Sequence, residues 1–393
     1  MYTKILAAYS NDYENRVKSS SGGVFSEIAK YVISNNGYVF GATMKREEGQ
    51  FICMHKECTE IEELDELRGS KYAPSELKDS YKRIKTLLDE KKLVLFSGTP
   101  CQVAGLLSFL GKQYENLITI DFICHGVPSQ ILINKIIKEI EDNTQKKVKK
   151  VDFRDKVTGW DNYSFTIKFE DGSVNSIIGL KSDFMKLFLS DMYLRESCYN
   201  CQYKGIYRES DITLGDFWGV QDYLQLSTEE IEKGVSVVII HSENANKIFE
   251  IMGDKLTTEI LNETVFDTSN IYVKKCAIRP LNKKIYEKIL FTNKSSEVIE
   301  KYNKQKKIYK FQNKVLGKLE KIVKRKKIEF KGLPNKKHCY GCLACEKICP
   351  FDAIKIEKDK LNFSYPLIDL DKCKKCKKCE LVCPQRNISY YKR

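Results

Sequence analysis

The feature that most constrains this chain is a duplicated run of cysteines near its C-terminus. Each run has the spacing C-x2-C-x2-C-x3-C followed by proline, and the second run lies 34 positions after the first. The eight cysteines are Cys339, Cys342, Cys345, Cys349, Cys373, Cys376, Cys379 and Cys383. Residues 351–371, between the runs, contain short alternating stretches that predict two strands joined by a turn.

Two 4Fe-4S clusters are the cofactors that this spacing predicts. Each cubane cluster needs four thiolates, and in two-cluster ferredoxins the fourth cysteine of each run binds the other cluster. The pattern therefore predicts one cluster on Cys339, Cys342, Cys345 and Cys383. It predicts the second on Cys349, Cys373, Cys376 and Cys379. Structural zinc is the alternative, but zinc sites use pairs of ligands closed tetrahedrally around one ion.

The cysteine content of the whole chain also indicates metal or redox chemistry. The chain has 393 residues and 15 cysteines, and an odd number with tight spacing is not typical of disulfides. Its N-terminus becomes polar too early for a signal peptide, and no window approaches about 18 uninterrupted apolar residues. We therefore expect a cytoplasmic protein without a transmembrane segment, whose thiols stay reduced.

The net charge of +14 is concentrated in one segment. Residues 301–337 hold 15 Lys and Arg against two Asp and Glu, whereas residues 1–300 hold 40 against 44. Residues 338–393 hold 12 against seven. Because the basic segment contains no recognisable nucleic-acid-binding motif, we expect no nucleic-acid partner.

Residues 301–337 are interpreted as a basic linker between a body, residues 1–300, and a ferredoxin-type domain, residues 338–393. Apolar residues recur at helical spacing in the linker and predict an amphipathic helix; they are Ile308, Phe311, Val315, Leu319 and Ile322. A solvated interdomain helix is one interpretation. A docking surface for an acidic partner and peripheral contact with an anionic membrane are the others.

The body alternates strand-like and helix-like stretches, which predicts an α+β fold with a mixed sheet. The predicted strands are residues 4–10, 38–44, 51–57, 92–98, 116–124 and 235–240. The predicted helices are residues 22–34, 75–90, 100–110 and 129–141, with a further helix after residue 240. Asp171 and Gly172 separate two alternating runs and predict a hairpin over residues 164–178.

Four cysteines of the body are candidates for a third metal site. Cys101 and Cys124 each follow a predicted buried strand, and Cys198 and Cys201 form a C-x2-C pair. Together they would hold a third cluster on dispersed ligands, whereas zinc, a catalytic thiol at Cys101 or ordinary core cysteines are the alternatives. His125 directly follows Cys124 and is a candidate to line the same site.

Glycine-rich turns are candidate anion sites. The sequence SSSGGVF, residues 19–25, lies between a strand and a helix, where backbone N–H groups bind phosphates; a simple N-cap is an equal alternative. The chain has no G-x-G-x-x-G fingerprint and no Walker A loop, which disfavours a Rossmann dinucleotide domain and a P-loop nucleotidase. It also has no G-x-S-x-G motif, so a serine hydrolase is not expected.

Five motifs of the body together resemble the coenzyme F420 hydrogenase/dehydrogenase beta-subunit family. They read SSSGGVFSEIAKYVISNNGYVFGA, LRGSKYAPS, FSGTPCQVAGL, DFICHGVPS and CYNCQYKGIYRESDITLGDFWG. The resemblance covers roughly residues 1–300 and keeps the order and approximate spacing of the motifs. In many relatives the two-cluster domain precedes the body, whereas here it follows.

The resemblance implies an iron–sulfur flavoprotein that binds FAD and a 4Fe-4S cluster in its body. Carried over by motif, it implies that the ligands of that cluster are Cys101, Cys124, Cys198 and Cys201. It also implies flavin contacts from three turns, through Ser20, Ser21, Gly22, Gly23, Ser70, Lys71, Tyr72, Gly98 and Thr99. Relatives reduce coenzyme F420, serve as the input module of sulfite reductases or reduce chlorophyll-type pigments.

The function that we expect is an oxidoreductase that passes electrons between its clusters and FAD, with hydride transfer to or from an organic acceptor. Lys71, Arg154 and Arg208 are candidates to meet an anionic acceptor or the flavin phosphates. The alternative is a non-catalytic subunit that delivers electrons to a partner enzyme. The expected partner is accordingly a redox protein or a small-molecule acceptor.

Overall fold

The computed structural model describes residues 3–305, 326–328, 337–387 and 390–392. The chain forms two compact units. The first contains Met1–His125, Lys147–Gly179 and Tyr203–Lys275, and the second contains Gly126–Lys146, Leu180–Gln202 and Cys276–Arg393. The amphipathic helix expected over residues 308–322 lies outside the described residues, and the domain boundaries at residues 300 and 338 stay a prediction.

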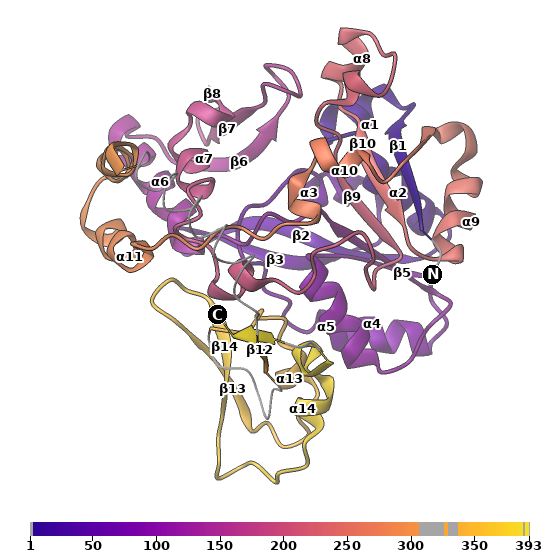
Figure 1. The fold of residues 1–393 in the computed structure, drawn as a ribbon, viewed down its shortest axis with the longest axis vertical. Helices are drawn as coiled ribbons and strands as arrows, with labels where there is room; N and C mark the ends of the chain where they lie inside the picture. The colour runs from indigo at the N-terminus through magenta and orange to yellow at the C-terminus, as the bar shows by residue number, and fades with distance from the viewer. Residues whose placement is uncertain (1–2, 306–325, 329–336, 388–389, 393) are drawn as a thin grey trace. The chain divides into compact units, whose positions relative to one another are not determined.

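An eight-stranded mixed sheet forms the centre of the first unit (Figure 1). Its strand order is β11-β1-β10-β9-β5-β4-β2-β3. In that order the bounds are Leu256–Leu261, Lys4–Ser10, Ser236–Ile240, Ile212–Asp216, Leu117–Phe122, Val94–Ser97, Tyr38–Glu47 and Gln50–Cys58. Strands β2, β4, β5 and β9 run parallel, and the remaining neighbours pair antiparallel.

The inner strands β1, β4 and β10 are buried on both faces, which explains why they are apolar almost throughout. In β1, Leu6 and Ala8 belong to one apolar cluster, and Ile5 and Ala7 belong to the cluster on the opposite face. The helices of this unit are α1 Tyr13–Lys18, α2 Val24–Ser34, α3 Leu64–Leu67, α4 Ser80–Asp89, α5 Pro100–Leu110, α8 Thr228–Glu232, α9 Glu243–Met252 and α10 Val265–Thr268. Helices α2 and α9 pack on the face that contains Leu6.

The strand directions bring several loops to one edge of the sheet. Strand β1 is antiparallel to β10, which is antiparallel to β9, so β1 runs in the same direction as β9, β5 and β4. The carboxyl ends of these four strands therefore lie along the same edge, which is where open α/β sheets bind ligands. The loops that begin at residues 11, 98, 123 and 217 start there.

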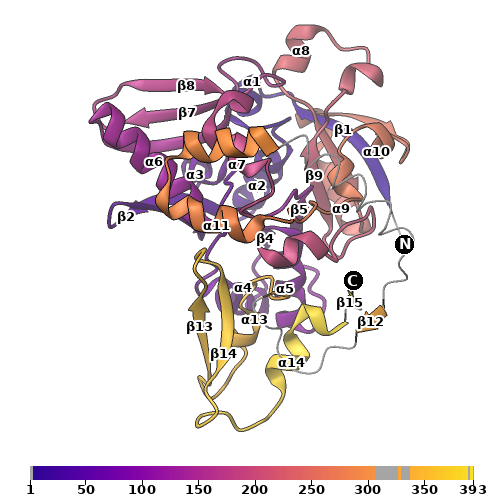
Figure 2. The ribbon, with the colours of Figure 1, turned by 60° about the vertical axis from the view of Figure 1, so that its left-hand side comes forward.

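A smaller three-stranded antiparallel sheet completes the first unit (Figure 2). It consists of β6 Val148–Asp155, β7 Ser164–Phe169 and β8 Val174–Ile178. The hairpin predicted from Asp171 and Gly172 is confirmed by the pairing of β7 with β8.

The second unit contains several helices and a small cysteine-rich domain. Its helices include α6 Gln130–Thr144, α7 Asp183–Phe188 and α11 Lys283–Thr292. The cysteine-rich domain contains β13 Ile354–Lys358, β14 Ser364–Ile368, α13 Ala344–Lys347 and α14 Lys378–Val382. Strands β13 and β14 form the hairpin predicted between the two cysteine runs. A further pair joins β12 Lys326–Ile328 to β15 Tyr390–Lys392.

The fold is a mixed α/β body with a small ferredoxin-type domain, as predicted, but one helix begins five residues later than expected. Helix α4 begins at Ser80 rather than at residue 75. The reason is that Glu76 pairs with the edge of β3, where its N–H donates to Cys53 and its carbonyl accepts from His55. Across the described ranges, no helix is long and apolar enough to cross a membrane.

Candidate functional site

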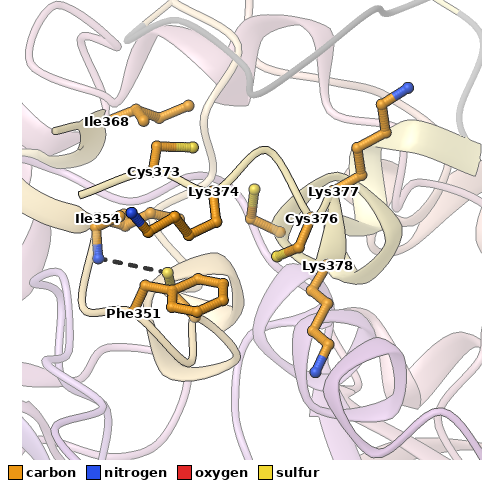
Figure 3. A pocket seen from close by; sticks show the side chains of 11 residues that line it. Phe351, Ile354, Ile368, Cys373, Lys374, Cys376, Lys377 and Lys378 are labelled. Atoms are coloured by element: carbon orange, nitrogen blue, oxygen red, sulfur yellow. Dashed lines mark hydrogen bonds between the residues drawn. The ribbon is translucent and has the colours of Figure 1, made fainter. Parts of the chain in front are cut away.

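The cysteines of the C-terminal domain line two separate cavities. The first cavity is lined by Cys339, Cys342, Cys345 and Cys383. The second is lined by Cys349, Cys373, Cys376 and Cys379. Each cavity thus takes three cysteines from one run and one from the other. Figure 3 shows the second cavity, with the side chains of Cys373 and Cys376 beside it.

The two runs have the same backbone conformation, as a duplicated motif requires. The residue two places after the first cysteine has positive φ in both runs, 69° at Gly341 and 54° at Lys375. The residue four places after it does too, 58° at Leu343 and 62° at Lys377. A short helix then starts at equivalent positions, at Ala344 in α13 and at Lys378 in α14.

Backbone amides point at several of these sulfur atoms. The N–H of Gly341 lies 3.3 Å from the Cys339 Sγ, and the N–H of Lys375 lies 3.4 Å from the Cys373 Sγ. These two contacts are equivalent in the duplication. Amide donors stabilise thiolates and tune the potential of a cluster that the thiolates bind.

The thiols that line the first cavity need nearby positive charge before they can ionise. Burial raises the pKa of Cys342 to about 12 and that of Cys345 well above its ordinary value, and the neighbouring thiols add to both shifts. Buried thiols this close together therefore stay protonated unless cations compensate their charge. Iron supplies that charge, so the donor set fits a metal cluster, whose binding would release protons.

Two of the candidate cysteines of the body lie at the loop edge of the first unit. Cys101 is in the first turn of α5, four residues after β4, and Cys124 is two residues after β5. Strands β4 and β5 are parallel neighbours, so both cysteines follow the same edge of the sheet. The Lys204 ammonium donates to the backbone carbonyls of Cys124 and Tyr272, and the Tyr272 ring contacts His125 at 4.1 Å between centroids.

Cys198 and Cys201 belong to the second unit. Cys198 lies in the 3₁₀ turn Glu196–Asn200, and Cys201 directly follows it. The N–H of Val127 points at the Cys198 Sγ at 3.5 Å, and the Cys276 thiol donates to the carbonyl of Cys201 at 3.4 Å.

The SSSGG turn is held by bonds within the first unit. The Ser21 hydroxyl donates to the carbonyl of Val235, and the N–H of Gly22 donates to the Ser236 hydroxyl. A side chain at position 22 would place Cβ 2.5 Å from the carbonyl oxygen of Ala8, so only glycine fits there. Gly23 is the N-cap of α2, and the structure places Ser20 beside it in the turn, partly exposed.

The other two predicted turns are joined to each other. Thr99 and Gln102 form a capping box at the start of α5, and the N–H of Thr99 donates to the Gln102 side chain at 3.0 Å. The Gln102 amide then reaches the carbonyl of Ser75. The turns that contain Gly98 and Ser70 therefore lie on the same side of the first unit.

Of the three basic residues predicted for the site, Arg154 has the most buried N–H groups without a hydrogen-bond partner among the described residues. The residue is 6 % exposed, and its guanidinium bonds Asp216 through Nη1 at 3.0 Å. Its Nε and Nη2 atoms are buried and have no hydrogen-bond partner among the described residues. The guanidinium lies 4.0 Å from the Tyr163 ring centroid and 4.8 Å from that of Trp218. These two buried donors make Arg154 a candidate ligand for an anion, with the Tyr72 hydroxyl also close to the guanidinium.

Lys71 and Arg208 have more conventional surroundings. The Lys71 ammonium donates to the carbonyl of Arg68 at 2.6 Å, and burial lowers its pKa to about 8. Arg208 forms a buried ion pair with Asp121 at 3.0 Å and also donates to the carbonyl of Phe122. The side chain of Arg208 thus stabilises the carboxyl end of β5.

Lys156 is a buried lysine beside the SSSGG turn for which the sequence carries little signal. Its ammonium donates to the carbonyls of Arg16, Ser21 and Lys233 at 2.5–2.8 Å, which ties it to the SSSGG turn. Burial lowers the pKa of Lys156 to about 7, opposed by Asp216. The only signal in the sequence was its position two residues after Arg154.

The cysteine-lined cavities define an iron–sulfur electron-transfer protein, and comparison with known proteins gives its family. Family models for the beta subunit of coenzyme F420 hydrogenase/dehydrogenase match residues 5–82 (N-terminal part) and 91–264 (C-terminal part). A 4Fe-4S dicluster domain model matches residues 338–388. The chain belongs to the coenzyme F420 hydrogenase/dehydrogenase beta-subunit family.

One solved structure illustrates the similarity. A chain of the F420-reducing [NiFe] hydrogenase complex from Methanosarcina barkeri, determined as a xenon derivative, is 18% identical, with a TM-score of 0.44. The match covers 77% of this chain and 90% of that chain. No protein with a curated description matched the sequence.

Proposed function

We propose that this protein is an iron–sulfur flavoprotein oxidoreductase that exchanges electrons between its C-terminal clusters and a flavin-binding body. The observation that carries the proposal is the pair of cavities, each lined by four cysteines. The bound groups would supply one-electron transfer at the clusters and hydride transfer at FAD. The protein itself would hold these groups and shape the acceptor site.

We assign one C-terminal cluster to Cys339, Cys342, Cys345 and Cys383, and the other to Cys349, Cys373, Cys376 and Cys379. The lining of the two cavities and the amide contacts to sulfur support this division. Tetrahedral zinc would not need two runs of four cysteines that exchange their last members.

A third cluster bound by Cys101, Cys124, Cys198 and Cys201 is part of the same proposal. Cys101 and Cys124 follow parallel neighbouring strands, and Cys198 and Cys201 flank a single turn. The Cys198 Sγ also has an amide donor, as the C-terminal ligands do. These features support cluster ligation over an inert role in the core.

FAD is the flavin that the family resemblance implies, and Arg154 is the residue best prepared to hold its anionic part. Its two unpartnered buried donors fit phosphate oxygens, and Tyr163 and Trp218 keep the guanidinium in place. Further proposed contacts come from the three turns and from the loop after β5: Ser20, Ser21, Gly22, Gly23, Ser70, Lys71, Tyr72, Gly98, Thr99 and His125.

The acceptor that we propose is coenzyme F420 or another organic hydride carrier. A second candidate function is electron delivery to a separate catalytic subunit, which the family description as a beta subunit favours. Both functions use the same clusters, so the acceptor distinguishes them.

The test uses protein purified without oxygen, reconstituted with FAD, and Arg154→Gln as the variant. The wild type should retain flavin and, after reduction, should be reoxidised by coenzyme F420. Arg154→Gln should lose most of the flavin and keep its iron. Arg154→Lys, which preserves one charge, should retain an intermediate amount. A wild type that binds no flavin would contradict the enzyme proposal and leave the electron-transfer subunit.

A further inference from the structure

The two cluster loops of the C-terminal domain are alike in backbone but differ in their surroundings. The first loop, residues 339–345, is covered by residues 195–202 of the same unit. The Ser197 hydroxyl donates to the carbonyl of Cys339 at 3.1 Å, and the N–H of Gln202 donates to the Tyr340 hydroxyl at 3.2 Å. This loop therefore faces the segment that contains the C-x2-C pair.

The Arg195 side chain packs closely against the first loop. A Cβ atom at Gly341 would lie 2.6 Å from the Arg195 Nη1. The guanidinium is fixed by a 3.0 Å bond to the carbonyl of Ser364 and lies over the Phe363 ring. The first loop consequently has little surface for a partner, and Cys339 and Cys345 are buried.

The second loop, residues 373–379, has the opposite character. Cys376 is exposed, and so are the lysines that alternate with the cysteines: Lys372, Lys374, Lys375, Lys377 and Lys378. In Figure 3 the side chains of Lys377 and Lys378 extend away from the cavity. None of the five makes an ion pair with another residue in the part of the chain that the structure describes.

The charge of this loop points to its partner. Asp371 and Glu380 flank the loop and are the acidic residues of positions 371–380. An oxidised 4Fe-4S cluster with four thiolates carries a charge of about −2. The five lysines carry one more charge than these acidic groups and the cluster together, and all five are exposed. An exposed basic fringe steers acidic proteins and orients them on docking.

We propose that residues 372–378 form the docking surface for a small acidic electron-transfer protein, which exchanges one electron with the cluster behind Cys376. The inference rests on the proposed function, since it requires that cluster. No bond forms or breaks in this exchange: the partner is oxidised as the cluster is reduced, or the reverse. The first cluster, whose loop is covered by residues 195–202, is then not the one that this partner reaches.

The test measures binding of an acidic two-cluster ferredoxin to the complete, cluster-loaded protein by calorimetry without oxygen. Lys374→Glu/Lys378→Glu should weaken the Kd by about tenfold or more at low salt. Lys374→Gln/Lys378→Gln should give an intermediate loss. The matched control, Lys82→Glu/Lys92→Glu, changes the net charge equally at exposed lysines of the first unit and should alter the Kd less than about twofold. Wild-type binding should weaken as NaCl is raised.

The iron content of each protein separates the two possible failures. Equal Kd values for the wild type and the charge-reversed protein, with iron retained in both, would overturn the docking proposal alone. Wild-type binding to phosphatidylglycerol vesicles but not to the ferredoxin would overturn it too. A wild type without clusters would overturn the proposed function, and the docking proposal with it.

Discussion

Gly341 and Lys375 occupy equivalent positions of the duplicated motif, and their different neighbours explain their different identities. Both have positive φ, but only Gly341 lies against a buried side chain, that of Arg195. Lys375 is exposed, so its side chain meets no such obstacle. The motif therefore tolerates a non-glycine residue where it faces solvent and excludes one where it is covered.

Gly341→Ala should destabilise the protein by about 1–3 kcal/mol, because alanine resists positive φ and its Cβ would displace Arg195. Urea unfolding followed by the visible absorbance of the clusters measures the loss. Lys375→Ala places the same residue at the equivalent exposed position and should cost less than about 0.5 kcal/mol. Equal losses would show that the contact with Arg195 is unimportant.

His55 provides a pH-dependent contribution to stability. Its Nε2 donates to the carbonyl of Ser97 at 3.0 Å, so its Nδ1 accepts from the Ser75 hydroxyl and the ring is neutral. Burial lowers the pKa of His55 to about 4 from an ordinary 6.5. As the pH falls from 6.5 towards 4, the unfolded chain binds a proton that the folded chain does not, so stability is lost.

The wild type should therefore lose up to roughly 3 kcal/mol more than His55→Gln across this pH interval. Above pH 6.5 the difference between the two proteins should stay constant. The measurement is the free energy of unfolding of both proteins at several pH values. Parallel pH profiles would contradict a buried neutral His55.

At the scale of elements, the start of α5 shows how a helix cap also orders a candidate site. Thr99 and Gln102 cap the helix reciprocally, and the Thr99 hydroxyl lies 3.2 Å from the Cys101 Sγ. Thr99→Ala should cost about 1 kcal/mol in unfolding free energy, whereas Thr99→Ser should cost a fraction of that. If both substitutions cost the same, the hydroxyl would not be the stabilising group.

Elements with strong local signals were predictable from the sequence. Strand β1 and helix α5 have the predicted bounds, because an apolar run and a Thr-Pro start mark them locally. The start of α4 was not predictable, since the bridge between Met54 and Glu76 that delays it joins residues far apart in sequence.

Part of the candidate site was also predictable from the sequence, and part was not. The cysteine spacing and the two-cluster ferredoxin pattern together group the cysteines as the two C-terminal cavities do; a short loop brings together only three of the four in each cavity. The pairing of Arg154 with Asp216 could not be read from the sequence, since it brings together β6 and the end of β9. The same applies to Arg195 over Gly341, which depends on the packing of the second unit.

At the scale of the whole molecule, charge and cysteines are distributed unevenly along the chain. The segment of residues 301–337 carries most of the net charge, and the lysines of residues 372–378 lie beside an exposed cysteine. The body carries almost no net charge but holds the residues that we assign to the flavin and to the third cluster. This division suits a protein that exchanges electrons with a partner at one domain and with an organic acceptor at another.

The measurement that tests the account most directly is the iron, acid-labile sulfide and flavin content per chain, on protein purified without oxygen. Three clusters and one flavin predict about twelve iron atoms, about twelve sulfides and one FAD. Cys198→Ser/Cys201→Ser should reduce the iron to about eight and leave the C-terminal clusters intact. About eight iron atoms in both proteins, with no flavin in the wild type, would contradict the account of the body.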